Sequence, residues 1–105
     1  MKLLEAKKVK VGEKEFLVKI TLRSMIDYET LSGKSITDIE GTENLIKFFY
    51  CTAKAGAKSI GEAFTYSYDE FLDSIDNFYN EALTNFSEAL FESGGEGKKP
   101  LRSSK

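Results

Sequence analysis

The chain of 105 residues contains no histidine and no tryptophan, and only one cysteine and one proline. The lack of histidine removes the usual general base, the commonest metal ligand and every Ser-His or Cys-His catalytic arrangement. A single cysteine excludes any disulfide within the chain. The sequence also has no glycine-rich phosphate loop followed by a helix, no Cys-x-x-Cys pair and no calcium-loop pattern. We therefore expect no catalytic residues, no bound metal and no cofactor.

Long apolar runs are absent as well. No segment approaches the roughly 20 apolar residues that a membrane-spanning helix needs. The first residues, MKLLEAKKVKVG, carry charges where a signal peptide has its apolar core. We expect a cytoplasmic protein that does not associate with membranes.

The net charge of −2 conceals a segregation of charge along the chain. Residues 1–23 carry seven Lys/Arg and three Glu, and residues 94–105 carry four Lys/Arg and one Glu. Between them, residues 24–93 carry 13 Asp/Glu and only four Lys. Duplex-binding proteins usually show a basic footprint on the folded body, so this acidic body argues against nucleic acid as a partner. We interpret the two basic ends as a solvated strand face and a solvated tail.

What is present indicates an α+β fold that is mostly helical. Residues 3–21 predict a β-hairpin, because Val9 and Val11 alternate with lysines and Phe16, Val18 and Ile20 alternate with more polar residues, about a turn at residues 12–13. Two strands alone are marginal in water. The hairpin must therefore pack on the helices or pair with another chain.

Three or four helices, five at most, are expected after the hairpin. The first covers residues 22–32, with Gly33 as its stop and a stripe of Leu22, Met25, Ile26, Tyr28 or Glu29, and Leu31. A short turn capped by Ser35 or Thr37 follows, and Gly41 ends it. The central, most buried helix begins at Thr42, carries Phe48 and Phe49, and ends among residues 55–57, with Gly61 as a further stop.

The last helical region begins with an S-x-x-E capping box, Ser67 to Glu70. It predicts either one long helix or two helices joined near residues 76–77, with Asp76 as the N-cap of the second. Residues 1–93 then form one globular domain, a hairpin (3–21) and a helical body (22–93). Residues 94–105 have too few apolar residues to order themselves and are expected to be a disordered basic tail.

Two groups of residues could suggest catalysis, but structural roles explain both of them better. Asp69, Asp73 and Asp76 lie near one another on a helical face, but paired acids work as catalysts only when burial separates their pKa values. Their polar neighbours indicate a solvated face instead. Cys51 lies within the apolar run FFYCTA and is interpreted as a core residue rather than a reactive thiol.

Aromatic residues are the better candidates for function. Phe64, Tyr66 and Tyr68 alternate just before the capping box, and tyrosine suits interfaces because it combines contact area with a polar tip. Packing in the core or the loop is the alternative. The candidate partner-binding residues are Phe64, Tyr66, Tyr68, Phe71, Phe78 and Tyr79.

The order of these parts resembles the tail assembly chaperones of long-tailed bacteriophages and prophages. In that family the first helix ends in a Glu-x-Leu-(Ser/Thr)-Gly-Lys-Ser run, and Glu29, Leu31, Ser32, Gly33, Lys34 and Ser35 match it. The central apolar helix and the Tyr-Asp-Glu-Phe-Leu-Asp start at residues 68–73 also match, so the resemblance covers roughly residues 16–92.

The resemblance implies a protein that is not an enzyme and works in the bacterial host cytoplasm. Such chaperones bind the long helical tape-measure protein, keep it soluble and help recruit tail-tube subunits. The alternative is a small acidic interaction module, such as an antitoxin or an adaptor, that forms a homo-oligomer through its hairpin. An enzyme that uses the acidic residues is a third alternative.

Overall fold

The computed structural model describes residues 5–94 and has the predicted architecture, an N-terminal hairpin followed by helices. The strands are β1 (Lys7–Val11) and β2 (Lys14–Val18), and the α-helices are α1 (Leu22–Ser32), α2 (Gly41–Ser59), α3 (Tyr68–Ile75) and α4 (Tyr79–Gly94). A 3₁₀ turn, η1 (Asp76–Phe78), joins α3 to α4. The predicted disordered tail, from residue 95 onward, lies outside the described residues.

The hairpin forms as its alternation predicts. β1 and β2 pair antiparallel, with Val9 opposite Phe16 and Val11 opposite Lys14. Gly12 and Glu13 make the two-residue turn, and Gly12 adopts a positive φ of 62°, which glycine accepts without strain. Val9, Val11, Phe16 and Val18 are all buried. The hairpin therefore has one core face and one solvated face.

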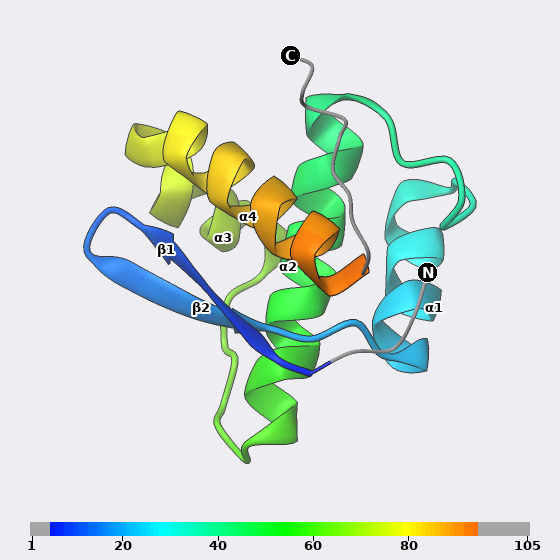
Figure 1. Ribbon diagram of the computed structural model, residues 1–105, viewed down its shortest axis with the longest axis horizontal. Coiled ribbons are helices and arrows are strands. Elements are labelled where there is room, and N and C mark those ends of the chain that lie inside the picture. The colour runs from blue at the N-terminus through cyan, green and yellow to red at the C-terminus, as the bar shows by residue number, and fades with distance from the viewer. Residues whose placement is uncertain (1–4, 95–105) are drawn as a thin grey trace.

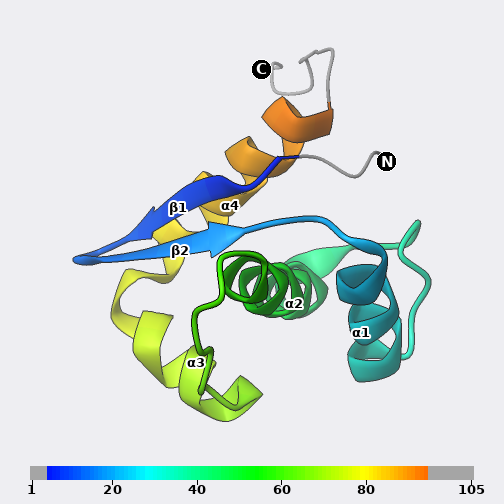
Figure 2. The same ribbon diagram turned by 90° about the horizontal axis from the view of Figure 1, so that it is seen from below.

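The hairpin packs on helices of its own chain, which is one of the two arrangements that the sequence predicts. β2 contacts α2, and β1 contacts α4 (Figures 1 and 2). Two side chains of α4 bind the hairpin backbone: Asn85 Nδ2 donates to the Lys10 carbonyl at 2.7 Å, and Glu81 Oε1 accepts from the Gly12 N–H at 3.0 Å. The first strand and the last helix thus lie side by side.

The central position predicted for α2 is confirmed. It contacts β2, α1, α3 and α4. Phe48 and Phe49 are both 0% exposed, and the Phe49 ring has three aromatic neighbours: Phe16 at 5.7 Å, Phe71 at 5.1 Å and Phe86, stacked on it, at 4.7 Å. Most of the hydrophobic core is assembled around this helix.

The predicted bounds of α2 were wrong at both ends. The helix begins one residue earlier than expected, at Gly41, and it continues through residues 55–57 to Ser59. Gly56 lies inside the helix because β2 crosses there: a Cβ atom at Gly56 would overlap the Leu17 carbonyl oxygen and lie 2.6 Å from the carbonyl carbon. The expected second stop at Gly61 is present, with φ 75° and a hydrogen bond from the Glu62 N–H to the Ala57 carbonyl at 2.9 Å.

The bounds of α1 were predicted correctly, but its buried face was not. Gly33 ends the helix in a left-handed conformation (φ 73°) and donates its N–H to the Glu29 carbonyl at 2.9 Å. The buried residues are Ser24 and Tyr28, whereas Leu22, Ile26 and Leu31 are 64%, 50% and 37% exposed. Ser24 can be buried because it forms a capping box with Thr21, so its hydroxyl is hydrogen-bonded.

The loop after α1 is held by its own polar side chains. The Glu29 carboxylate accepts a hydrogen bond from the Ile36 N–H at 2.9 Å, and the Ser32 hydroxyl accepts one from the Lys34 N–H at 3.0 Å. Ser35 caps the following turn, as predicted, by accepting from the Thr37 N–H at 3.2 Å. The Glu-x-Leu-Ser-Gly-Lys-Ser run is therefore a helix stop and a loop closure.

Both hydrogen bonds of the predicted capping box at the start of α3 are present. The Ser67 hydroxyl accepts from the Glu70 N–H at 3.1 Å, and the Glu70 carboxylate accepts from the Ser67 N–H at 2.9 Å. Of the two alternatives for the following region, two helices joined near residues 76–77 is the correct one. Asp76 is not an N-cap, because its backbone is helical (φ −59°, ψ −41°) and it lies within the 3₁₀ turn.

Candidate partner-binding surfaces

The carboxylates that invited an enzymatic interpretation lie on the surface. Asp69, Asp73 and Asp76 are exposed, and among residues 5–90, whose side chains the structure describes, no group of three His, Cys, Asp or Glu is arranged to bind a metal ion. Acid–base chemistry by paired acids requires burial, and these three side chains are exposed to solvent. Within the same residues, no helix is both long and apolar enough to span a bilayer.

Cys51 is a core residue, as predicted. Its side chain is 2% exposed. Burial, with a smaller contribution from nearby Asp27, raises the pKa of the thiol to about 12, and Lys54 opposes the shift only in part. The reactive thiolate is thus disfavoured at neutral pH, and Cys51 is not a candidate nucleophile.

The six aromatic residues predicted to bind a partner fall into three environments. Phe71 is fully buried beneath Phe16 and Phe49, so the prediction that it forms part of a surface was wrong. Its place on the first turn of α3 directs it to the core. The half-buried members are Phe64, Tyr66 and Tyr68, and the exposed members are Phe78 and Tyr79.

Tyr50 of α2 organises the half-buried group. Its ring lies 5.6 Å from Phe64 and 5.5 Å from Tyr68, and its hydroxyl donates to the Tyr66 carbonyl at 2.9 Å. Burial raises the pKa of both Tyr50 and Tyr68, so both hydroxyls stay protonated across the physiological range. These contacts attach residues 60–67 to α2, and the aromatic alternation in that segment is explained largely by packing.

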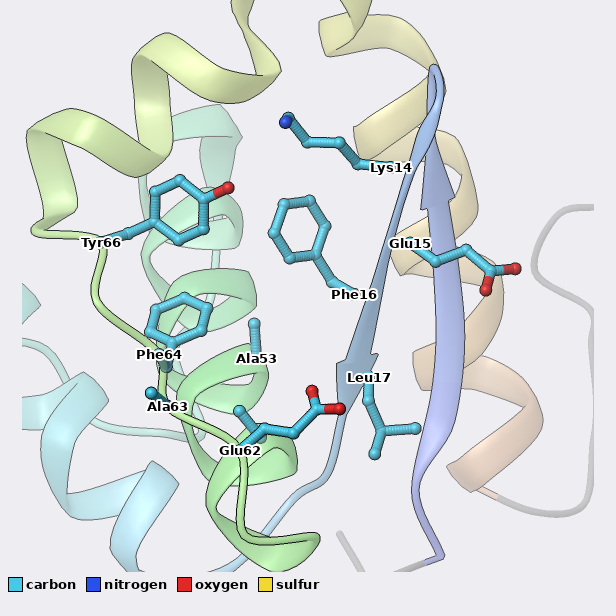
Figure 3. Close-up of a pocket in the computed structure, with 10 residues that line it drawn as sticks. Lys14, Glu15, Phe16, Leu17, Ala53, Glu62, Ala63, Phe64 and Tyr66 are labelled. Atoms are coloured by element: carbon cyan, nitrogen blue, oxygen red, sulfur yellow. The ribbon is translucent and has the colours of Figure 1, made fainter.

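A groove remains between this segment and β2. It has a volume of about 310 Å³ and lies at the lower end of the usual range for ligand pockets, about 300–1,000 Å³. One wall is β2, the other is residues 62–66, and α2 supplies the floor with Ala53 and Ala57. Phe16 and the rings of Phe64 and Tyr66 point into the space between the walls (Figure 3).

Two pairs of large apolar residues stand exposed outside the groove. Phe78 and Tyr79, at the joint between α3 and α4, are 45% and 58% exposed, and the Phe78 ring lies against Gly12 of the hairpin turn. We call these two residues the joint patch. Leu22 and Ile26 lie four residues apart on α1, and therefore on one helical face. We call them the α1 pair.

The sequence named Phe78 and Tyr79 among the candidate partner-binding residues but missed the α1 pair and most of the groove. Leu22 and Ile26 have the spacing of a core stripe, so only the position of α1 against α2 shows that they are exposed. The groove has no local signal, since its walls lie about 50 residues apart in the chain. Comparisons of this chain with protein-family models, curated proteins and solved structures find no match.

Proposed function

We propose that this protein is a phage or prophage tail assembly chaperone, which binds the helical tape-measure protein and assists assembly of the tail tube. The observation that carries the proposal is the joint patch. A chaperone that holds a client in solution needs apolar and aromatic surface to share with it, surrounded by charge that keeps the complex soluble. Phe78 and Tyr79 provide such surface within a helical body of 13 acidic and five basic residues.

Two further features support this proposal. The residues that carry the family resemblance, Glu29 to Ser35, form a compact helix stop closed by their own hydrogen bonds. The patch lies where α3, α4 and the hairpin turn meet, so a client helix laid across it contacts parts of the fold that are far apart in sequence.

Co-expression with a candidate tape-measure protein, the longest helical product of the neighbouring genes, tests the proposal. The intact chain should raise the soluble fraction of that protein severalfold, measured by sedimentation and quantitative blotting. The double variant Phe78→Ser, Tyr79→Ser should lose this gain. Ile60→Ser is the matched control, because Ile60 is 54% exposed but lies outside the joint patch. Failure of the intact chain to solubilise the client, or full activity of the double variant, would contradict the proposal.

The second candidate is a small acidic interaction module that acts as a dimer. The α1 pair favours it, because two exposed aliphatic residues on one helical face suit a symmetric helix contact. Light scattering on the purified chain distinguishes the two candidates. A dimer that Ile26→Glu converts to a monomer, combined with no effect on tape-measure solubility, would favour the interaction module.

A further inference from the structure

On the edge of β2 that faces away from β1, the backbone N–H and C=O groups of every second residue point outward. In an antiparallel pair, successive residues alternately bond the partner strand and point away from it. The two-residue turn makes Val11 and Lys14 the closing hydrogen-bonded pair. Glu15 and Leu17 therefore direct their N–H and C=O groups away from β1. The Lys19 N–H, next in this outward series, confirms the phase because it donates outside the hairpin, to the Thr52 carbonyl of α2 at 3.0 Å.

The two edges of the hairpin are covered to different extents. α4 covers the edge of β1 through Asn85 and Glu81. α2 covers the edge of β2 only near its end, where the Leu17 carbonyl lies against Gly56. Three outward groups remain on β2: the Glu15 N–H, the Glu15 carbonyl and the Leu17 N–H. Within residues 5–94 none of the three has a hydrogen-bond partner.

These groups lie along the groove described above. Four consecutive residues of β2, Lys14 to Leu17, line it. Neighbouring side chains of a strand point to opposite faces, so a groove lined by four in succession runs along the backbone edge. Figure 3 shows β2 on one side of the space and Phe64 and Tyr66 on the other.

We propose that this groove binds an extended peptide segment of a partner protein, which adds to β2 as a third strand. The segment would bond the free groups of Glu15 and Leu17, as in other cases of strand addition to a sheet edge. Alternate side chains of the segment would lie on Phe16 and Phe64, so small apolar residues at every second position are the preferred sequence.

The shape and charge of the groove further define its occupant. Residues 62–66 form the wall opposite the strand edge, so the occupant we propose is a single extended segment rather than the sheet edge of a second folded copy. Lys14 lies at one end and Glu62 at the other. A segment antiparallel to β2 should therefore begin with a basic residue near Glu62 and end with an acidic residue near Lys14. This site is separate from the joint patch, and the inference does not rest on the proposed function.

Peptide binding to the full chain tests the proposal. The probe is a fluorescein-labelled peptide of seven residues in which valine alternates with threonine, with a basic first residue and an acidic last residue. Two further peptides carry N-methyl groups on alternate backbone amides. One series is methylated at the odd-numbered residues and the other at the even-numbered residues. Strand addition requires that one series weakens binding at least tenfold and the other leaves it nearly unchanged. Equal tolerance of both series, or no binding of the unmodified peptide, would overturn the proposal.

A matched pair of variants locates the binding. Ala63→Trp places a large side chain at the wall of the groove and should weaken binding at least tenfold. Thr65→Trp is the control, since Thr65 is exposed in the same segment but does not line the groove. Both variants should retain the circular dichroism spectrum of the parent chain. Equal affinity of the two variants would place the peptide elsewhere and overturn the proposal.

Hydrogen exchange measured by NMR adds a readout at the strand itself. In the free chain the Glu15 and Leu17 amides should exchange rapidly, while the Phe16 amide, which bonds β1, exchanges slowly. Saturation with the peptide should slow exchange of the Glu15 and Leu17 amides at least tenfold. Protection of these two amides in the free chain would overturn the proposal, because it would show that a second copy or another segment of this chain already occupies the edge.

Discussion

Gly56 of α2 lies directly against the backbone of Leu17 in β2, and this contact sets how closely the central helix approaches the hairpin. The nearest atoms belong to the strand backbone, which cannot turn aside as a side chain can. The Val18 Cα is also close, 3.1 Å from the position that a Cβ atom would take. The contact leads to the first of four predictions.

Gly56→Ala should destabilise the protein even though alanine favours helices. Helix propensity alone predicts a gain of about 0.8–1.0 kcal/mol. Overpacking against an immobile neighbour costs about 1–3 kcal/mol, and overlap with backbone places this site at the upper end, so we expect a net loss of about 2 kcal/mol in urea denaturation. Thr42→Ala, at an exposed position of the same helix, should change the stability by no more than about 0.5 kcal/mol. A more stable Gly56→Ala protein would show that β2 can move away from α2.

Phe49→Ala should be among the most damaging single substitutions. The side chain is fully buried among Phe16, Phe71 and Phe86, and its removal leaves a cavity that three rings cannot readily fill. Losses for such substitutions are about 3–5 kcal/mol, a large part of the total stability of a small domain. Denaturant titration measures the loss, with exposed Ile60→Ala as the control. A loss near zero would mean that Phe49 faces a partner or solvent.

Tyr28→Phe should leave the protein as stable as the parent or stabilise it. Tyr28 is fully buried, and its hydroxyl is the one buried side-chain polar atom in the described residues that has no hydrogen-bond partner. An unsatisfied buried group costs about 1–3 kcal/mol, and phenylalanine keeps the ring that packs on Phe48 at 5.5 Å. Thermal and urea unfolding should show a gain of up to about 1–2 kcal/mol. A clear loss would reveal a partner for the hydroxyl, such as a bound water molecule.

Cys51 should make the stability fall at alkaline pH. The pKa of the thiol rises from its ordinary value of 9.0 to about 12 in the folded chain. Between these values the unfolded chain releases the proton while the folded chain keeps it. The unfolded state then binds fewer protons, so the free energy of unfolding decreases as the pH rises above 9. Below pH 9 the thiol keeps its proton in both states, so the stability is not reduced there.

The variant Cys51→Ala isolates that effect from other alkaline titrations. Its stability should fall less steeply than that of the parent between pH 9 and 11, measured by urea denaturation. The native parent should also react slowly with a thiol reagent at pH 8 and rapidly once unfolded, because the side chain is 2% exposed. Identical slopes, or rapid labelling of the native chain, would contradict the assignment.

The features that the sequence predicted well are those that neighbouring residues determine. The turn at Gly12, the stop at Gly33 and the capping box of Ser67 and Glu70 each depend on residues within a few positions of one another. The alternation of the strands is equally local, and all of these elements lie where the pattern indicated.

Predictions failed where contacts with a distant part of the chain determine the local structure or its burial. Gly56 is a residue typical of a helix end, yet it lies inside α2, where the close approach of β2 leaves no space for a side chain. Leu22 and Ile26 have core spacing, yet α1 buries Ser24 and Tyr28 instead. The groove depends on which strand edge the helices leave uncovered, and no short stretch of sequence carries that information.

The attachment of β1 to α4 also has a consequence for how the protein is made. Asn85 and Glu81 bind backbone groups of the hairpin that lie 75 and 69 positions earlier in the chain. During synthesis the hairpin leaves the ribosome long before α4 exists, and a two-stranded hairpin alone is marginal in water. The lysine-rich strand β1 therefore lacks its contacts with α4 until that helix emerges from the ribosome. The native fold closes late, when the emergence of α4 brings the two ends of the described domain together.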